Sequence, residues 1–150
     1  MYNIIIAMLS ISWEQIHTDA KLLAAKINTE FDLLIALQRG GTIPCTILSH
    51  ILDKPMISIG VSSYDGTKKT NFITQYQDCF DNRYIGKRII FVDDLSDTGD
   101  TFKYVLSTYD RFFKDMKTAS LYTKFGTKCV PDFFVKEYQS SEWLEFPWEA

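Results

Sequence analysis

The stretch IIFVDDLSDTGDTF, residues 89–102, decides the fold class of this chain. Its first half is rich in β-branched and aromatic residues, which is typical of a buried strand. Three aspartates follow, and Gly99 then precedes a segment in which Phe102, Val105 and Tyr109 recur at helical spacing. A core strand that passes through a short loop into a helix indicates an α/β protein.

The rest of the chain repeats this alternation. We expect helices at 12–27, 43–52 and 99–113, and strands at 33–37, 56–64, 87–94, 118–124 and 132–138. Residues 65–86 are polar and have no regular period, so no element is predicted there. In the first helix, Ser12 and Gln15 form a capping box. The residues predicted to be buried on that helix are Trp13, Ile16, Ala20, Leu23 and Ile27.

Strands that alternate with helices require crossover connections, which are right-handed and place helices on both faces of a parallel sheet. The predicted architecture is therefore a twisted, mainly parallel sheet of about five strands flanked by helices. Ligands of such sheets bind beyond the carboxyl ends of the strands. Two glycine-containing loops, 38–42 and 95–100, are expected at those ends.

Composition restricts the class of protein. The chain of 150 residues predicts one domain, 1–150, and its net charge of −3 argues against a broad nucleic-acid surface. No apolar run reaches transmembrane length, and the start MYNIIIAMLS lacks the basic segment of a secretion signal. Cys45, Cys79 and Cys129 are widely separated and odd in number, which favours reduced thiols and a cytoplasmic location.

The acidic loop after the strand at 87–94 has three possible explanations. A calcium loop that begins at Asp94 would place Val105 where a glutamate is needed, and one that begins at Asp93 would place Leu95 at a ligand position. A Walker phosphate loop requires a glycine-rich run followed by lysine and a hydroxyl residue, and the chain has none. A simple capped turn accounts for one acid and one glycine, but not for the cluster.

A ligand that carries both hydroxyls and a phosphate accounts for the whole loop. Adjacent carboxylates can accept hydrogen bonds from a sugar diol and hold hydrated magnesium. The segment DTGDT opens the next helix, where backbone N–H groups and the helix dipole favour a phosphate. Gly99 allows the backbone to approach that phosphate closely.

The stretch VDDLSDTGDT resembles the phosphoribosyl pyrophosphate signature of the type I phosphoribosyltransferases. The segments LIALQRGGTIPCTILSHIL, VSSYD, LYTK and EWLEFPWE follow the order seen in bacterial xanthine-guanine phosphoribosyltransferases, and the likeness extends from Trp13 onward. This resemblance implies the type I phosphoribosyltransferase fold with a small hood. It also implies Mg²⁺ as cofactor, with Asp93 and Asp94 as its ligands, directly or through water.

The resemblance assigns the donor site. Asp93 and Asp94 would contact the ribose hydroxyls, and Asp97 would be the catalytic residue that manages the purine proton. The residues that would hold the 5′-phosphate are Thr98, Gly99, Asp100 and Thr101, and Asp97 also belongs to the set that binds the donor. Asp100 departs from the glycine or neutral residue common in the family. A carboxylate there would repel a phosphate unless it points outward or caps the helix.

Two further loops belong to the donor site by resemblance. Arg39, Gly40 and Gly41 match the pyrophosphate loop, in which the family often has a cis peptide that would fall at Gln38–Arg39. The segment 62–86, which begins with Ser62, Ser63 and Tyr64, resembles the flexible loop that closes over the donor.

The purine site would lie in the last third of the chain. Lys124 matches a lysine that donates to the purine 6-oxo group, although a solvated lysine at a strand end is the ordinary alternative. Trp143 matches the aromatic residue that stacks on the base, and Leu144 the residue whose backbone meets the exocyclic edge. Trp148 is expected to pack rather than to contact the base. Residues 138–150 would form this base-pocket segment, which ends earlier than expected for the family.

The predicted function is purine salvage, in which a 5-phosphoribosyl group passes from phosphoribosyl pyrophosphate to guanine, xanthine or hypoxanthine and pyrophosphate is released. Two alternatives stay open: a non-catalytic ligand sensor or regulator of the same fold, and an enzyme for another nucleobase. The expected partners are the two small-molecule substrates, without nucleic acid or stable membrane insertion. The family forms dimers or tetramers, so a homodimer or homotetramer is expected.

Overall fold

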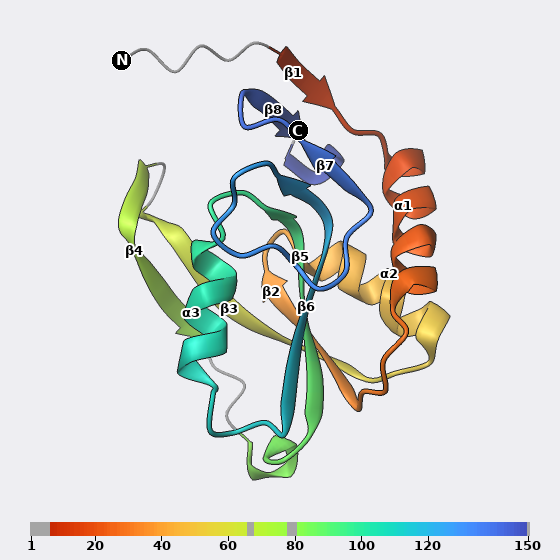
Figure 1. Cartoon of the computed structure of the whole chain (residues 1–150), viewed down its shortest axis with the longest axis vertical. Coiled ribbons are helices and arrows are strands. Elements are labelled where there is room, and N and C mark those ends of the chain that lie inside the picture. The colour runs from red at the N-terminus through yellow and green to blue at the C-terminus, as the bar shows by residue number, and fades with distance from the viewer. Residues whose placement is uncertain (1–6, 66–67, 78–80, 150) are drawn as a thin grey trace.

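The computed structural model of the chain describes residues 7–65, 68–77 and 81–149. Between residues 63 and 77, the structure describes one side chain, that of Gln75. The elements alternate along the chain as expected, and the predicted α/β class is confirmed (Figure 1).

A six-stranded sheet forms the centre of the molecule, with the strand order β4-β3-β2-β5-β6-β7. All neighbouring strands are parallel except β3 and β4, which form an antiparallel pair. The strands are β2 (Leu33–Gln38), β3 (Met56–Asp65), β4 (Lys68–Gln77), β5 (Arg88–Ser96), β6 (Asp115–Lys124) and β7 (Lys136–Tyr138). A 3₁₀ turn, η1 (Asn82–Tyr84), lies between β4 and β5.

Helices cover both faces of the sheet (Figure 1). Helices α1 (Trp13–Lys26) and α2 (Thr42–Leu52) pack on one face, and α3 (Asp100–Thr108) packs on the other. A strand with helices on both of its faces must bury alternate side chains in two different cores, and β2 does so. Leu34 and Ala36 belong to the first core, whereas Leu33, Ile35 and Leu37 belong to the second.

Some observed elements differ from the predicted ones: β6 begins at Asp115 rather than at 118, and β7 begins at Lys136 rather than at 132. Helix α3 ends at Thr108 rather than at 113, because the Phe112 carbonyl accepts from Gly86 N (2.7 Å) and Lys114 N donates to Lys87 O (2.9 Å) instead of continuing the helix. In the region without a prediction, β4 forms by pairing with β3. That pairing is a tertiary contact, which a sequence period does not record.

The burial predicted for α1 is correct for three of its residues and wrong for Trp13. Ile16, Ala20 and Leu23 are buried, and Ser12 caps the helix by accepting from Gln15 N (3.1 Å). Trp13, in the first turn of the helix, is 56% exposed, and its ring centroid lies 6.0 Å from that of Trp148.

The two ends of the chain meet in a second, smaller sheet. Strand β1 (Ala7–Ser10) pairs in parallel with β8 (Glu142–Glu145), and Ile11 N continues the ladder by donating to Glu145 O (2.8 Å). A short 3₁₀ turn, η2 (Pro147–Glu149), follows β8. This small sheet lies beside the carboxyl ends of the central strands (Figure 1).

Candidate active site

A cavity of about 1110 Å³ opens at the carboxyl ends of β2, β5 and β6. It brings together residues from five separate segments of the chain, including nearly all of those predicted from sequence. Its lining includes Arg39, Gly40, Ser62, Asp93, Asp94, Asp97, Thr98, Gly99, Thr101, Lys124, Trp143, Leu144, Phe146, Trp148 and Glu149. Of the predicted site residues whose side chains are described, only Gly41 and Asp100 are outside this lining.

The loop after β2 approaches the neighbouring strand closely. The Gln38–Arg39 peptide is cis, as the resemblance implied, and Arg39 is exposed on the cavity wall. A Cβ added at Gly40 would overlap the carboxylate of Asp94, whereas one added at Gly41 would overlap the backbone oxygen of Val92. Gly40 therefore faces a side chain of the site, and Gly41 faces the backbone of the sheet.

The acidic pair lies in the centre of the cavity, at the end of β5. Asp93 Oδ1 accepts from Asp94 N (2.8 Å), so the two residues form one unit. Burial raises the pKa of both carboxyl groups, and the charge of Asp94 raises the pKa of Asp93 further. A ligand that supplies positive charge or hydroxyl donors would relieve both effects.

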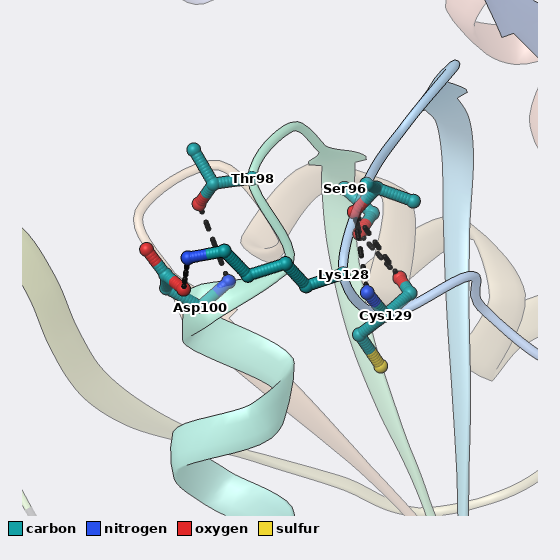
Figure 2. A network of polar contacts seen from close by, with 6 residues as sticks. Ser96, Thr98, Asp100, Lys128 and Cys129 are labelled. Carbon is teal, nitrogen blue, oxygen red and sulfur yellow. Dashed lines mark hydrogen bonds and ion pairs between the residues drawn. The ribbon is translucent and has the colours of Figure 1, made fainter.

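The loop between β5 and α3 lines the cavity and ends in a glycine with positive φ. Gly99 has φ of +88°, which favours glycine, and it immediately precedes the first turn of α3. Asp100 N donates to Thr98 Oγ1 (3.3 Å). The carboxylate of Asp100 pairs with Lys128 Nζ at 3.1 Å (Figure 2).

Lys124 is buried, which rules out the alternative that it is a solvated lysine at a strand end. It is only 5% exposed, lies at the end of β6, and its Nζ donates to the backbone carbonyl of Glu142. An ammonium group has three N–H donors, so Lys124 can also donate to an acceptor atom of a ligand. Trp143, the residue after Glu142, lines the same cavity and is 48% exposed.

Comparisons with known proteins agree with this geometry. Residues 12–150 match the Phosphoribosyl transferase domain family. The chain belongs to this family. It is 34% identical over 143 residues to a xanthine-guanine phosphoribosyltransferase of Desulfotalea psychrophila, covering 93% of this chain and 85% of that protein. A relative of the same name from Idiomarina loihiensis is 30% identical over 142 residues, with the same coverage.

Solved structures support the same membership. The purine phosphoribosyltransferase from Pyrococcus horikoshii is 33% identical, with a TM-score of 0.83, and the match covers 97% of this chain and 95% of that one. The Helicobacter pylori xanthine-guanine-hypoxanthine phosphoribosyltransferase has a TM-score of 0.76 at 22% identity, covering 95% and 93%, and shows the shared fold.

An aromatic stack supports the far wall of the phosphoribosyltransferase cavity. Phe146 stacks on Trp148, with centroids 4.9 Å apart and an angle of 9° between the rings, and on its other side it stacks on Tyr122 at 6.1 Å. Trp148 thus packs, as predicted, and its edge also lines the cavity. Leu144 is buried beneath this wall.

Glu149 is a cavity residue of this phosphoribosyltransferase that the sequence analysis missed. It lines the cavity, its Oε2 accepts from Phe146 N (3.0 Å), and its charge contributes to the raised pKa of Asp94. The signal available in sequence was its place directly after the family's PW pair.

The hairpin of β3 and β4 adds Ser62 to the cavity lining. Ser63 and Tyr64 lie in the same strand, and their side chains are outside the described part of the structure. The base of the hairpin is anchored to α3 through Gln75, whose Nε2 donates to Tyr109 Oη (2.6 Å) and whose Oε1 accepts from Tyr104 Oη (3.2 Å).

The described residues of this phosphoribosyltransferase hold no cluster of three or more potential metal ligands. The cavity offers two adjacent carboxylates instead, which fits Mg²⁺, since that ion usually takes one or two carboxylates and completes its shell with water and phosphate. Within the described ranges, no helix is long and apolar enough to cross a membrane. Cys45 and Cys129 are free thiols, and Cys79 lies outside those ranges.

Proposed function

We propose that the chain transfers the 5-phosphoribosyl group of phosphoribosyl pyrophosphate to a 6-oxopurine in purine salvage. The observation that carries this proposal is the single cavity in which the acidic pair, the loop before α3 and the buried Lys124 meet. These groups suit a sugar diol, a phosphate and a purine oxygen respectively. The names of the relatives and of the Pyrococcus horikoshii structure support the same reaction.

In this reaction the bond from a purine nitrogen to C1′ of the ribose forms as the bond from C1′ to the pyrophosphate oxygen breaks. Asp93 and Asp94 accept from the ribose hydroxyls and orient the sugar. The guanidinium of Arg39 and the backbone amides of Gly40 and Gly41 bind the leaving pyrophosphate. Bound Mg²⁺ would be held by Asp93 and Asp94, and it would neutralise charge on the pyrophosphate.

The purine is held on the opposite side of the sugar. Trp143 stacks on its face, Lys124 donates to its 6-oxo group, and the backbone of Leu144 meets its exocyclic edge. Asp97, an exposed residue of the cavity wall, accepts the purine proton as the new bond forms. The hairpin that begins at Ser62 closes over the donor and excludes water from the reacting carbon.

The test is pyrophosphate release from purified protein incubated with phosphoribosyl pyrophosphate, magnesium and one of guanine, xanthine, hypoxanthine or adenine. We expect turnover with at least one 6-oxopurine and about tenfold or more preference for it over adenine. Asp97→Asn serves as the matched variant. It should depress kcat more than it raises the KM of either substrate, because its role is strongest in the transition state.

Binding of both substrates without any turnover would support the alternative, a ligand sensor of the same fold. Faster turnover with adenine or a pyrimidine would support the other alternative, an enzyme for another nucleobase. We further propose that the protein works in the cytoplasm as a homodimer or homotetramer. Light scattering at several protein concentrations measures the oligomeric state.

A further inference from the structure

The segment 127–129, which follows β6, packs against the loop before α3 and is called the brace below. Lys128 N donates to Thr98 O (2.8 Å), and Ser96 Oγ donates to Cys129 O (2.8 Å). A Cβ at Gly99 would overlap Cys129 N and lie 3.0 Å from Lys128 N, so the two segments are in direct backbone contact. Figure 2 shows the Ser96–Cys129 hydrogen bond together with the Asp100–Lys128 pair.

This brace fixes which backbone groups the loop offers to a ligand. The carbonyl of Thr98 is occupied by Lys128 N, so it is held away from an anion in the cavity. The first N–H groups of a helix have no acceptor within that helix, and α3 begins at Asp100, directly after the braced glycine. The loop is thereby held with its donors, rather than its acceptors, available to a phosphate.

The side chain of Lys128 adds a charge effect to this backbone effect. Asp100 places a carboxylate in the first turn of α3, where it would repel a phosphate bound to the same turn. Lys128 Nζ lies 3.1 Å from its Oδ1, and both side chains are partly exposed, at 61% for Lys128 and 44% for Asp100. An exposed pair of this kind contributes little to folding, so its main consequence is the local field.

We propose that Lys128 is a positioning residue of the donor site, which cancels the charge of Asp100 and keeps the loop before α3 able to bind the 5′-phosphate. The inference rests on the proposed function, because the phosphate concerned is that of the donor. Lys128 itself is not among the residues that line the cavity. It acts through Asp100 and Thr98.

A double-mutant cycle tests the charge effect. The variants are Lys128→Met, Asp100→Asn and the two combined, with Lys21→Met on the exposed side of α1 as the control for loss of a surface lysine. Binding of phosphoribosyl pyrophosphate and of ribose 5-phosphate is measured by calorimetry at low and high salt, beside kcat and the KM of each substrate.

We expect Lys128→Met to weaken binding of both phosphates about tenfold at low salt, and less at high salt, where the field is screened. Asp100→Asn keeps the backbone N–H of residue 100 and leaves the charge of Lys128 uncancelled, so it should bind both phosphates more tightly at low salt. The double variant should return to within about twofold of the unmodified protein, since no charge remains to be cancelled. The KM of the purine and the result for Lys21→Met should be unchanged.

The inference is wrong if Lys128→Met binds both phosphates normally, or if Asp100→Asn does not restore the binding that Lys128→Met has lost. Failure of the proposed function gives a different result. Ribose 5-phosphate would still bind with the same dependence on Lys128, while no pyrophosphate was released with any base. If the unmodified protein bound neither phosphate compound, both proposals would be overturned.

Discussion

The part of the cavity proposed to bind the donor (the donor half, residues 39–41 and 93–101) is shaped mainly by backbone, whereas the part proposed to bind the purine (the purine half, Lys124, Trp143 and Leu144) is shaped by side chains. In the donor half, glycines allow two loops to pack against neighbouring backbone and carboxylate atoms. In the purine half, a buried lysine on β6 is hydrogen-bonded to the backbone of β8. Each loop of the first half is thus a contiguous stretch of sequence, whereas the second half is assembled from residues of β6 and β8.

This difference predicts how each half responds to substitution. Where a site is formed by closely packed backbone, there is no room for an added atom. A single methyl group can therefore disrupt folding or binding. A side-chain-shaped site loses affinity or selectivity while the fold remains. The predictions below test that contrast, from the largest expected effect to the smallest.

Gly41→Ala should have the largest effect. Its Cβ would overlap Val92 O and lie 2.8 Å from Leu37 O, and neither backbone atom can move without disturbing the sheet. We expect a loss of about 3 kcal/mol or more in the free energy of unfolding, measured by denaturant titration.

Gly40→Ala is the matched control for Gly41→Ala. The added methyl group would meet only the carboxylate of Asp94, which can rotate, so the protein should fold and lose donor binding instead. Equal stability losses in the two variants would remove the distinction between the structural and the ligand-facing side of this loop.

Asp93→Asn and Asp94→Asn should weaken magnesium-dependent donor binding by at least about tenfold, because charge-assisted hydrogen bonds to the ribose are lost. The melting temperature should be unchanged or slightly higher, since each substitution relieves repulsion between two neighbouring half-buried carboxylates. Calorimetry with the donor and thermal unfolding measure the two effects. Unaltered donor affinity in both variants would contradict the assignment of this pair.

Lys124→Met should act on the purine half alone. The substitution removes the N–H donors that favour an oxo group over an amino group, so a preference of about tenfold for guanine over adenine should shrink. Donor affinity should be unchanged. Lys117→Met, near the opposite end of the same strand, is the control and should keep the full preference. Equal rates for adenine and guanine in the unmodified protein would assign the reading of the base to another group.

Asp32→Asn should have the smallest effect and should change neither half of the cavity. Asp32 lies just before β2, at the end of the sheet opposite the cavity, and its carboxylate accepts from Arg88 N (2.9 Å), Nε (3.1 Å) and Nη2 (3.0 Å). Hydrogen bonds from Arg88 hold the pKa of Asp32 below its usual value. We expect a small drop in melting temperature and normal catalysis.

The pH dependence of this drop has a definite sign. A carboxyl group whose pKa is lowered by folding adds stability above its unfolded pKa, about 4, and loses that contribution as pH falls towards the folded value. The difference in melting temperature between the unmodified protein and Asp32→Asn should therefore be largest at neutral pH and should shrink below about pH 4. A difference that grew on acidification would contradict the proposed role of Arg88.

The sequence predicted the fold class and drew attention to the acidic loop 93–101 because both leave local patterns. The run from Ile89 to Phe102 contains a strand, an acidic pair and a glycine loop in one contiguous stretch. The purine half has no such pattern. Lys124 and Trp143 were found only through resemblance, and Glu149 was missed, because its place in the cavity depends on how β8 and η2 fold back over the sheet.

The remaining differences from prediction have the same origin. Strand β4 forms through its pairing with β3, and Trp13 is exposed at the end of an otherwise buried helical face. The partner of Asp100 could not be found from the loop alone. Lys128 is 28 residues away in the chain and comes into contact only when β5 and β6 lie side by side.

The pairing of β1 with β8 has a consequence for synthesis on the ribosome. A growing chain emerges with its N-terminus first. Residues 7–10 are therefore made early, and they cannot pair with β8 until residues 142–145 have been synthesised. Both loops of the donor half, and the segment that braces the loop before α3, are complete by residue 129. The wall proposed to bind the base is therefore the last part of the chain to be assembled, and a nascent chain stopped before Glu142 carries both loops without it.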